Sequence, residues 1–160
     1  MTDSILRIRR PLYLASTCTT CWRCGVAMPV VCLIAPQVEG AEGEVCILSE
    51  VRRLPDDVLI FIQRQFPSFR LKYSKTVQAS YYANTCPKCG VLSGDFHLHA
   101  EPGAPFFPET EEEASRLTLQ EIALGGSIEV EASLGMGVGE LILEHAKRKN
   151  AGQTAAPNRR

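Results

Sequence analysis

Two apolar runs without a helical period stand out in the first third of the chain. They cover residues 26–35 and 45–51, are rich in valine and isoleucine, and lie on either side of a polar loop at residues 37–44. Continuous apolar runs of this length are typical of buried β-strands, and glycine in the connecting loop allows a turn. We therefore expect a β-hairpin here, preceded by a short apolar segment at residues 12–15.

The hairpin is followed by the pattern of an amphipathic helix. Pro55 stands directly before two aspartates, a combination that favours a helix start. Apolar residues then recur at every fourth position from Val58 to Phe66, until Pro67 interrupts the pattern. We expect a helix over residues 55–65.

The second half of the chain mixes strand-like and helix-like patterns. Polar and apolar positions alternate through residues 70–83, 96–99 and 127–132, which predicts strands. Thr110, with a glutamate three residues later, has the form of a helix capping box, and we expect a helix from there toward Leu124. A further helical pattern runs through residues 140–149 and ends in basic residues.

Seven cysteines change this picture, because the chain shows no stretch that passes as a secretory signal. Disulfides belong mainly to exported proteins, so we expect thiols used for metal binding or chemistry in a reducing compartment. Four of the cysteines form two motifs of one type, termed here the first hook (residues 21–25, CWRCG) and the second hook (residues 86–90, CPKCG). Two residues between the cysteines let both sulfurs reach one ion, and the glycine allows a left-handed backbone.

The two hooks predict one tetrahedral metal site with Cys21, Cys24, Cys86 and Cys89 as its ligands. Thiolate ligands favour Zn²⁺ over hard cations. Cys18 is an alternative ligand, since it also forms a Cys-x-x-Cys pair with Cys21, although that pair has no following glycine. Unligated thiols or a redox pair are the other alternative, but a redox motif needs only one such pair.

The hooks are far apart in the sequence, with 61 residues between Cys24 and Cys86. Compact zinc motifs separate their ligand pairs by roughly 15–20 residues, so a zinc ribbon built from these hooks must be split by an inserted unit. A long separation costs little extra, because loop-closure entropy grows logarithmically. Cys32 and Cys46 fall in the expected strands, where a free cysteine acts as a small apolar side chain.

Charge is distributed unevenly along a chain whose formal net charge is only −1. This balance, with 45% apolar residues, excludes a disordered chain and a uniformly basic polyanion binder, and no apolar run is long enough to cross a membrane. Residues 58–94 nevertheless carry five basic groups and no acidic one. Aromatic residues interleave with these cations, a pattern that suits single-stranded nucleic acid, with candidate contacts at Arg70, Lys72, Tyr73, Lys75 and Lys88. The alternative places the aromatic rings in the core and the cations in solvent.

Two weaker sites remain open. Asp95, His97 and His99 share one face if residues 96–99 form a strand, and they then offer a second metal site. The alternative is an ordinary solvent-facing strand. A thiol enzyme would need His97 beside a cysteine outside the hooks, drawn from Cys18, Cys32 and Cys46.

The motif CWRCG at residues 21–25, YYANTCPKCG at residues 81–90 and GDFHLH at residues 94–99 resemble those of an uncharacterised family of small bacterial zinc-ribbon proteins. The likeness covers residues 18–35 and 81–99. It implies a bacterial, cytoplasmic protein with the same four cysteine ligands, and it carries no activity with it.

We therefore expect a small single α+β domain over residues 1–150, in which a split zinc ribbon holds β-strands beside two or three helices. Residues 25–85 form the insertion between the hooks, residues 100–150 an acidic C-terminal part, and residues 151–160 a disordered tail. The expected function is that of a non-enzymatic, zinc-stabilised binding module in the cytoplasm, away from membranes. Its partner is a protein or a nucleic acid, and a thiol-dependent or second-metal-dependent enzyme is the less favoured alternative.

Overall fold

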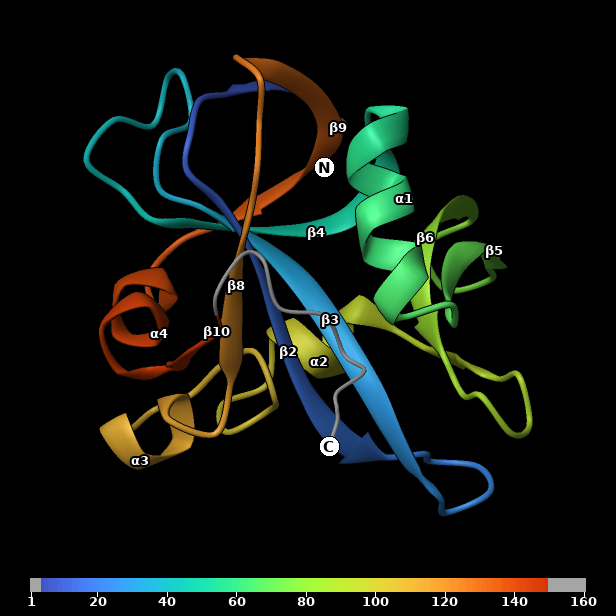
Figure 1. The fold of residues 1–160 in the computed structure, drawn as a ribbon. Helices are drawn as coiled ribbons and strands as arrows, with labels where there is room; N and C mark the ends of the chain where they lie inside the picture. The colour runs from blue at the N-terminus through green and yellow to red at the C-terminus, as the bar shows by residue number, and fades with distance from the viewer. Residues whose placement is uncertain (1–3, 150–160) are drawn as a thin grey trace, which may run out of the picture.

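The protein was analysed as a computed structural model that describes residues 4–149, and the expected tail at residues 151–160 lies outside this range. The described part is a small, sheet-rich α+β domain with four helices (Figure 1). The elements in chain order are β1 (Ser4–Ile8), β2 (Leu12–Thr20), β3 (Ala27–Ala35), β4 (Cys46–Arg53), α1 (Asp56–Gln65), β5 (Phe69–Ser74), β6 (Ala79–Thr85), β7 (Leu92–Ser93), α2 (Asp95–His99), α3 (Glu111–Ala114), β8 (Thr118–Ile122), β9 (Ile128–Gly135), α4 (Gly139–His145) and β10 (Lys147–Lys149).

The main sheet has the strand order β1-β9-β4-β3-β2-β8-β10, with β3 at its centre. All pairs in this order are antiparallel except β8 with β10. Strands from the two ends of the chain alternate in the order, because β9 lies between β1 and β4 while β8 pairs with β2. The N-terminal hairpin β2–β3 therefore has on its β2 side the strand β8, which comes much later in the sequence, and on its β3 side the next strand of the chain, β4.

Two hydrophobic cores lie on opposite faces of this sheet, and β3 contributes to both. Val31 and Leu33 belong to the first core, and Val30, Cys32 and Ile34 belong to the second. Burial on both faces explains why β3 is continuously apolar instead of alternating. The first core is covered by α1 through Val58 and Ile62, and the second by α2, α4 and the loops between them through Leu98, Phe106, Leu117 and Ile142.

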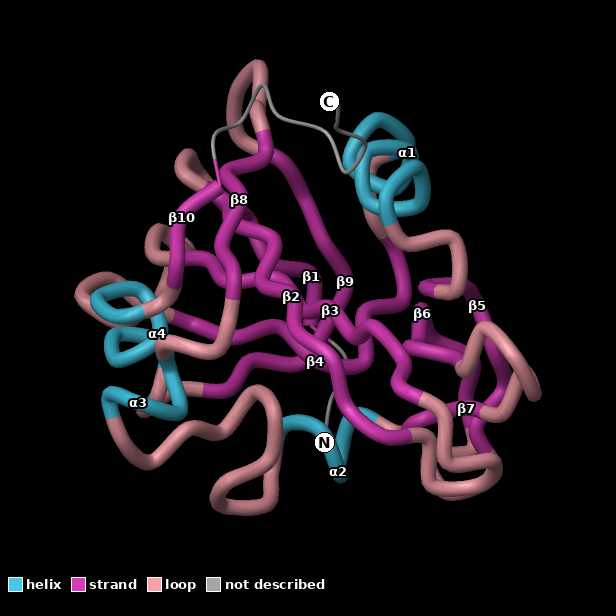
Figure 2. Tube along the Cα trace, turned by 60° about the horizontal axis from the view of Figure 1, so that its bottom comes forward, coloured by secondary structure: helices cyan, strands magenta, loops and turns pink. Residues whose placement is uncertain are grey.

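A smaller antiparallel unit, formed by β5, β6 and β7, lies beside the main sheet (Figure 2). Strand pairing connects this unit to the main sheet at one bridge, between Val51 of β4 and Tyr82 of β6. Figure 2 places this unit on one side of the molecule and α3 and α4 on the other. Between the two hooks the chain forms β3, β4, α1, β5 and β6, and β7 follows the second hook.

Several elements predicted from the sequence are confirmed. The strands expected at residues 26–35 and 45–51 pair as β3 and β4, the helix expected at residues 55–65 is α1, and the strand expected at residues 127–132 is β9. The Thr110 half of the capping box is present as well, since the N–H of Glu113 donates to Oγ1 of Thr110 at 3.1 Å, while the Glu113 carboxylate accepts the N–H of Glu109 at 2.7 Å instead of that of Thr110. In these places local chemistry and long-range packing favour the same structure.

Three expectations were wrong. Residues 96–99 belong to the helix α2 and not to a strand, because Leu98 and the side chain of His99 turn inward from one helical turn. The helix that begins after Thr110 ends at Ala114, since residues 118–122 pair with β2 as β8. The helix expected over residues 140–149 ends at His145, and β10 follows because it completes the sheet beside β8.

Two further differences concern the start of the chain. Residues 4–8 form the edge strand β1, which the apolar pattern did not predict. β2 continues to Thr20, so regular structure extends through Cys18 up to the first hook. Within residues 4–149, no helix is both long and apolar enough to cross a membrane.

Gly139, at the start of α4, offers a test of how tightly the second core is closed. It is buried, and a Cβ atom there would overlap the carbonyl oxygen and side chain of Val45. We expect Gly139→Ala to lower the free energy of unfolding by about 1–3 kcal/mol, because backbone atoms have little room to move. The matched change Gly126→Ala meets open space and should stay within about 0.5 kcal/mol of the wild type. Equal urea midpoints for the two variants would contradict this packing.

Candidate metal centre

The first hook is the turn that connects β2 with β3. The N–H of Cys21 donates to the carbonyl of Val26 at 2.8 Å, and the N–H of Gly25 donates to the carbonyl of Cys21 at 3.0 Å. Gly25 has φ of 82°, a left-handed conformation that a residue with a Cβ atom rarely adopts. The hairpin therefore ends in a tight loop that presents both of its cysteines on one side.

The second hook repeats this geometry between β6 and β7. The N–H of Cys86 donates to the carbonyl of Val91 at 2.9 Å, and the N–H of Gly90 donates to the carbonyl of Cys86 at 2.9 Å. Gly90 has φ of 78°, close to the value at Gly25. The glycine in each hook therefore has the backbone conformation expected from the sequence.

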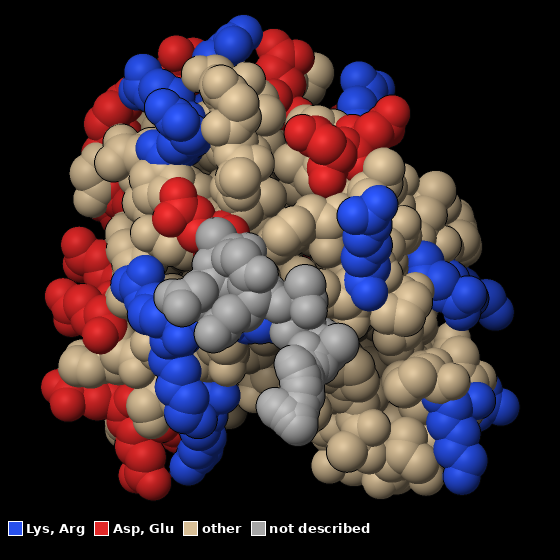
Figure 3. All heavy atoms as spheres, in the orientation of Figure 1, with Lys and Arg blue, Asp and Glu red and all other residues tan. Residues whose placement is uncertain are grey.

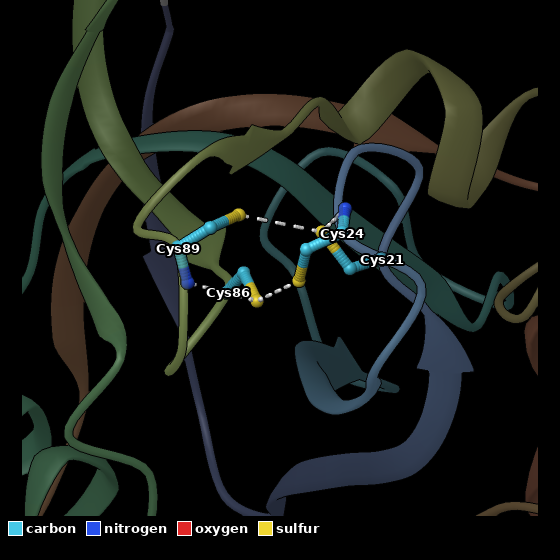
Figure 4. Close-up of side chains that lie close together, drawn as sticks. All are labelled: Cys21, Cys24, Cys86 and Cys89. Carbon is cyan, nitrogen blue, oxygen red and sulfur yellow. Dashed lines mark hydrogen bonds between the residues drawn. The ribbon is translucent and has the colours of Figure 1, made fainter.

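The two hooks face each other and bring four sulfurs together (Figure 4). The Sγ atoms of Cys21, Cys24, Cys86 and Cys89 all lie within 4.8 Å of one another. Two contacts run between the hooks, with 3.6 Å from Cys21 to Cys89 and 3.6 Å from Cys24 to Cys86. A disulfide would need about 2.05 Å, and all four thiols are free. This cluster can hold a metal ion.

Backbone N–H groups point at the first sulfur of each hook. The sulfur of Cys21 accepts from the N–H of Cys24 and of Arg23, both at 3.4 Å. The pKa of Cys21 is lowered to about 6, chiefly by the Cys24 N–H. In the second hook, the N–H groups of Cys89 and Lys88 lower the pKa of Cys86 in the same way. Stabilised thiolates are the form that binds metals.

The thiols also oppose each other's ionisation. The N–H of Val91 lowers the pKa of Cys89, but burial and the neighbouring cysteines outweigh that contact and raise the pKa to about 11. Four negative charges at these distances repel one another unless a cation lies among them. The cluster therefore favours full deprotonation only together with a positive ion.

Burial within the cluster follows the symmetry of the hooks. Cys21 and Cys86, the first cysteine of each hook, are each only 2% exposed and belong to the second hydrophobic core. Cys24 is exposed and Cys89 is half-buried. The centre thus lies at the rim of the core, with one sulfur of each hook directed to the interior and the other toward the surface.

The other three cysteines lie outside this cluster. Cys18, the alternative ligand, is exposed on β2 opposite Pro29 of β3. Cys32 and Cys46 are buried in β3 and β4, as expected from the sequence. Burial raises the pKa of both buried thiols, and Asp95 raises that of Cys32 further. Neither is therefore activated as a nucleophile.

Asn84 positions the second hook against the first hairpin. Its buried side chain accepts the N–H of Val31 at 2.8 Å and donates to the carbonyl of Val31 at 3.0 Å. β4 pairs with β3 only at residues 33–35, and at Val31 the Asn84 amide forms the hydrogen bonds that a neighbouring strand would otherwise form. Since Asn84 comes two residues before Cys86, this pair of hydrogen bonds sets the second hook opposite the first.

The candidate nucleic-acid residues are spread over the smaller unit. Tyr73 is 61% exposed, and Arg70, Lys75 and Lys88 are exposed as well, whereas Lys72 is half-buried. Two other aromatic rings of the segment are not available to a ligand, because Phe69 and Tyr81 are 6% and 1% exposed. The sequence left open whether the aromatic rings of this segment face a ligand or lie in the core. The structure has both, since Tyr73 is exposed while Phe69 and Tyr81 are buried.

The second candidate metal site does not assemble as expected, because its residues lie on a helix. Asp95 is buried, the His99 side chain is only 11% exposed, and the Oδ2 atom of Asp95 lies 3.9 Å from Nε2 of His99. His97 is exposed and lies 3.7 Å from Glu101 instead. Over residues 4–149, the four cysteines of the hooks form the only group of three or more His, Cys, Asp or Glu side chains that lie close enough to share an ion.

Sequence reasoning missed Trp22 and Asn84. Trp22 lies between the two cysteines of the first hook, and its indole N–H donates to the carbonyl of Leu92 in β7 at 3.0 Å. It therefore joins the two hooks a second time. A large aromatic residue inside a metal-binding turn was a visible signal, whereas an asparagine in a strand gives no indication of its partner.

Removal of the Asn84 amide should loosen the second hook. Asn84→Ala leaves a buried N–H and a buried carbonyl of Val31 without their partners, at about 1–3 kcal/mol for each group. We expect a loss of about 2–5 kcal/mol in the free energy of unfolding and weaker metal retention during dialysis. The control Ser80→Ala changes an exposed position on the same strand. A small effect of Asn84→Ala, equal to that of the control, would argue against this anchoring role.

The buried Asp95 should make stability depend on pH. Burial raises its pKa from the ordinary 3.8, although His99 and the N–H of Glu50 counteract this. The folded chain therefore binds the Asp95 proton more tightly than the unfolded chain does. Protonated Asp95 thus favours the folded state, and this contribution to the free energy of unfolding is lost as the pH rises from 3.8 through the pKa of the folded state. We expect Asp95→Asn to stabilise the protein at pH 7, with a gain that shrinks toward pH 4 in urea titrations.

The control for this prediction is Asp56→Asn. Asp56 is exposed in the first turn of α1, where a carboxylate favours the helix, so its replacement should bring no gain at pH 7. If the free energy of unfolding differed between Asp95→Asn and the wild type by the same amount at every pH, this would contradict a raised pKa of Asp95 in the folded protein.

Comparison of the chain with protein-family models, with curated proteins and with solved structures finds no match in any of the three. The case for function therefore rests on the geometry of the cysteine centre and its surroundings.

Proposed function

We propose that the protein is a zinc-ribbon binding module in which one Zn²⁺ is held by Cys21, Cys24, Cys86 and Cys89. The observation that carries this proposal is the spacing of the sulfurs. With Zn–S bonds of about 2.3 Å, a regular tetrahedron has edges of about 3.8 Å. The two sulfur contacts between the hooks, both at 3.6 Å, and the 4.8 Å limit on all six sulfur–sulfur distances support such a tetrahedron.

The proposed role of the ion is structural. Four thiolates close the coordination sphere of Zn²⁺, so no position is left for a water or a substrate. The two hooks stand at the ends of separate hairpins, β2–β3 and β6–β7, and an ion between them would fasten the smaller unit to the main sheet. We infer a non-enzymatic module whose partner is a protein or a nucleic acid. Its free thiols suit the reducing cytoplasm.

Metal content and stability test this proposal together. We expect one zinc per chain by elemental analysis, and loss of that zinc in Cys86→Ser or Cys89→Ser. Structural zinc contributes an apparent ~10–16 kcal/mol, which matches or exceeds the ~5–15 kcal/mol of a typical folded domain. Both variants, and the wild type treated with a strong chelator, should therefore lose the cooperative thermal transition.

Cys18→Ser is the matched control, because Cys18 is exposed and lies outside the cluster. This variant should keep its zinc and melt within a few degrees of the wild type. Full metal content in Cys89→Ser, or loss of metal in Cys18→Ser, would overturn the ligand set. A different resident metal, found by elemental analysis of protein from unsupplemented cells, would overturn the assignment to zinc.

A further inference from the structure

A groove of about 820 Å³ lies beside the metal centre. Its walls come from both halves of the cysteine site, since Thr20 and Trp22 belong to the end of β2 and the first hook, while Tyr73 and Leu92 belong to β5 and β7. Hydroxyl groups of Thr19, Thr76 and Ser93 are distributed among its mainly apolar lining. This volume is in the range of ligand-binding sites.

Trp22 forms an aromatic platform on one side of the groove. Its side chain is 67% exposed, although its indole N–H is held by the carbonyl of Leu92 at 3.0 Å. The hydrogen bond fixes the orientation of the ring while most of its apolar surface remains in water. A large aromatic ring held in this way is suited to stack with a planar ligand.

Tyr73 and Lys75 also line the groove. Tyr73 is 61% exposed on β5, and Lys75 is exposed in the turn that follows. Lys75 forms no ion pair with any carboxylate of residues 4–149. The groove thus combines two accessible aromatic rings with a cation that is available for a ligand.

The surface around β5 and β6 has the charge of a site for anions. Residues 58–94 contain five basic and no acidic side chains. Figure 3 shows the result over β5 and β6, at the lower right, where Lys and Arg side chains stand among uncharged ones with no Asp or Glu. The acidic side chains on this face lie over α3 and α4, on the opposite side, and along the top of the view.

The one carboxylate in the lining does not oppose an anion. Asp95 is 6% exposed, and its Oδ2 atom accepts the N–H of Glu50 at 2.7 Å and lies 3.9 Å from Nε2 of His99. Its carboxylate is therefore used inside the protein. The accessible charge of the groove comes from Lys75, with Arg23 of the first hook also exposed nearby in the sequence.

We propose that this groove binds single-stranded nucleic acid, with bases stacked on Trp22 and Tyr73 and a phosphate neutralised by Lys75. Stacking is independent of base identity, so the site recognises an unpaired strand more than a particular sequence. An acidic peptide would match the cations but would leave both exposed rings without a planar partner. The inference deepens the proposed function and rests on it, because an ion in the hooks would hold Trp22 and β7 at their present separation.

Binding is tested with the zinc-loaded full chain and a fluorescently labelled 12-nucleotide oligothymidylate. We expect a rise in anisotropy on binding and quenching of Trp22, which is the only tryptophan in the chain. Trp22→Ala and Tyr73→Ala should each weaken binding by about 5- to 150-fold, from the stacking energy of one base. Lys75→Ala should reduce the slope of log affinity against log salt by about 0.7.

Matched controls separate these effects from general changes in charge or fold. Met136→Ala removes another exposed apolar side chain, and Lys147→Ala removes another exposed cation, both away from the groove lining. Neither should change the affinity more than about twofold. Trp22→Phe keeps a ring without the Leu92 hydrogen bond and should recover most of the affinity lost in Trp22→Ala. A merely structural Trp22 would instead lower the melting temperature in both variants and leave affinity unchanged.

The failure of this inference is distinguishable from failure of the proposed function. Zinc-loaded, folded protein that does not bind the oligonucleotide, or binds a 12-base-pair duplex equally well, overturns the groove assignment and leaves the metal site intact. Binding of polyglutamate with the same sensitivity to Trp22→Ala would also overturn it in favour of a protein partner. Absence of zinc in cooperatively folded protein would overturn the proposed function itself.

Discussion

The pair of hydrogen bonds between the Asn84 side chain and the backbone of Val31 is the interaction on which the arrangement of the two hooks depends. β6 is attached to the main sheet by a single bridge to β4, so regular strand pairing alone holds the smaller unit weakly. The Asn84 amide adds the two hydrogen bonds that a neighbouring strand would supply, and it does so in a buried position. Such bonds are costly to leave unmade, which fixes the separation of the hooks.

Much of the cysteine centre was visible in the sequence because its chemistry is local. A Cys-x-x-Cys-Gly turn requires the same spacing and the same left-handed glycine wherever it occurs, and Gly25 and Gly90 both have that conformation. The helix α1 was equally local, with its acidic first turn and its interruption at Pro67. The four sulfurs come together as the paired motifs suggested.

The expectations that failed concern elements decided by distant partners. Residues 96–99 alternate like a strand, yet they form a helical turn. This turn places the His99 side chain in the interior, beside Asp95 and Phe106. β10 is a strand because β8 leaves an edge there, which the basic pattern of residues 147–149 gave no reason to expect. The groove was missed for a similar reason, since Trp22 and Tyr73 are far apart in the sequence and line one groove only in the folded chain.

The strand order also has a consequence for how the chain folds. β2 and β3 form a hairpin with local contacts, but β8, the other neighbour of β2, comes roughly a hundred residues later, toward the end of the described chain. During synthesis the N-terminal hairpin must therefore wait with one edge unpaired while the insertion and the second hook emerge from the ribosome. Contacts between distant residues slow folding, and exposed strand edges can pair with other chains. Early closure of the hooks would keep the growing chain compact until its last strands arrive.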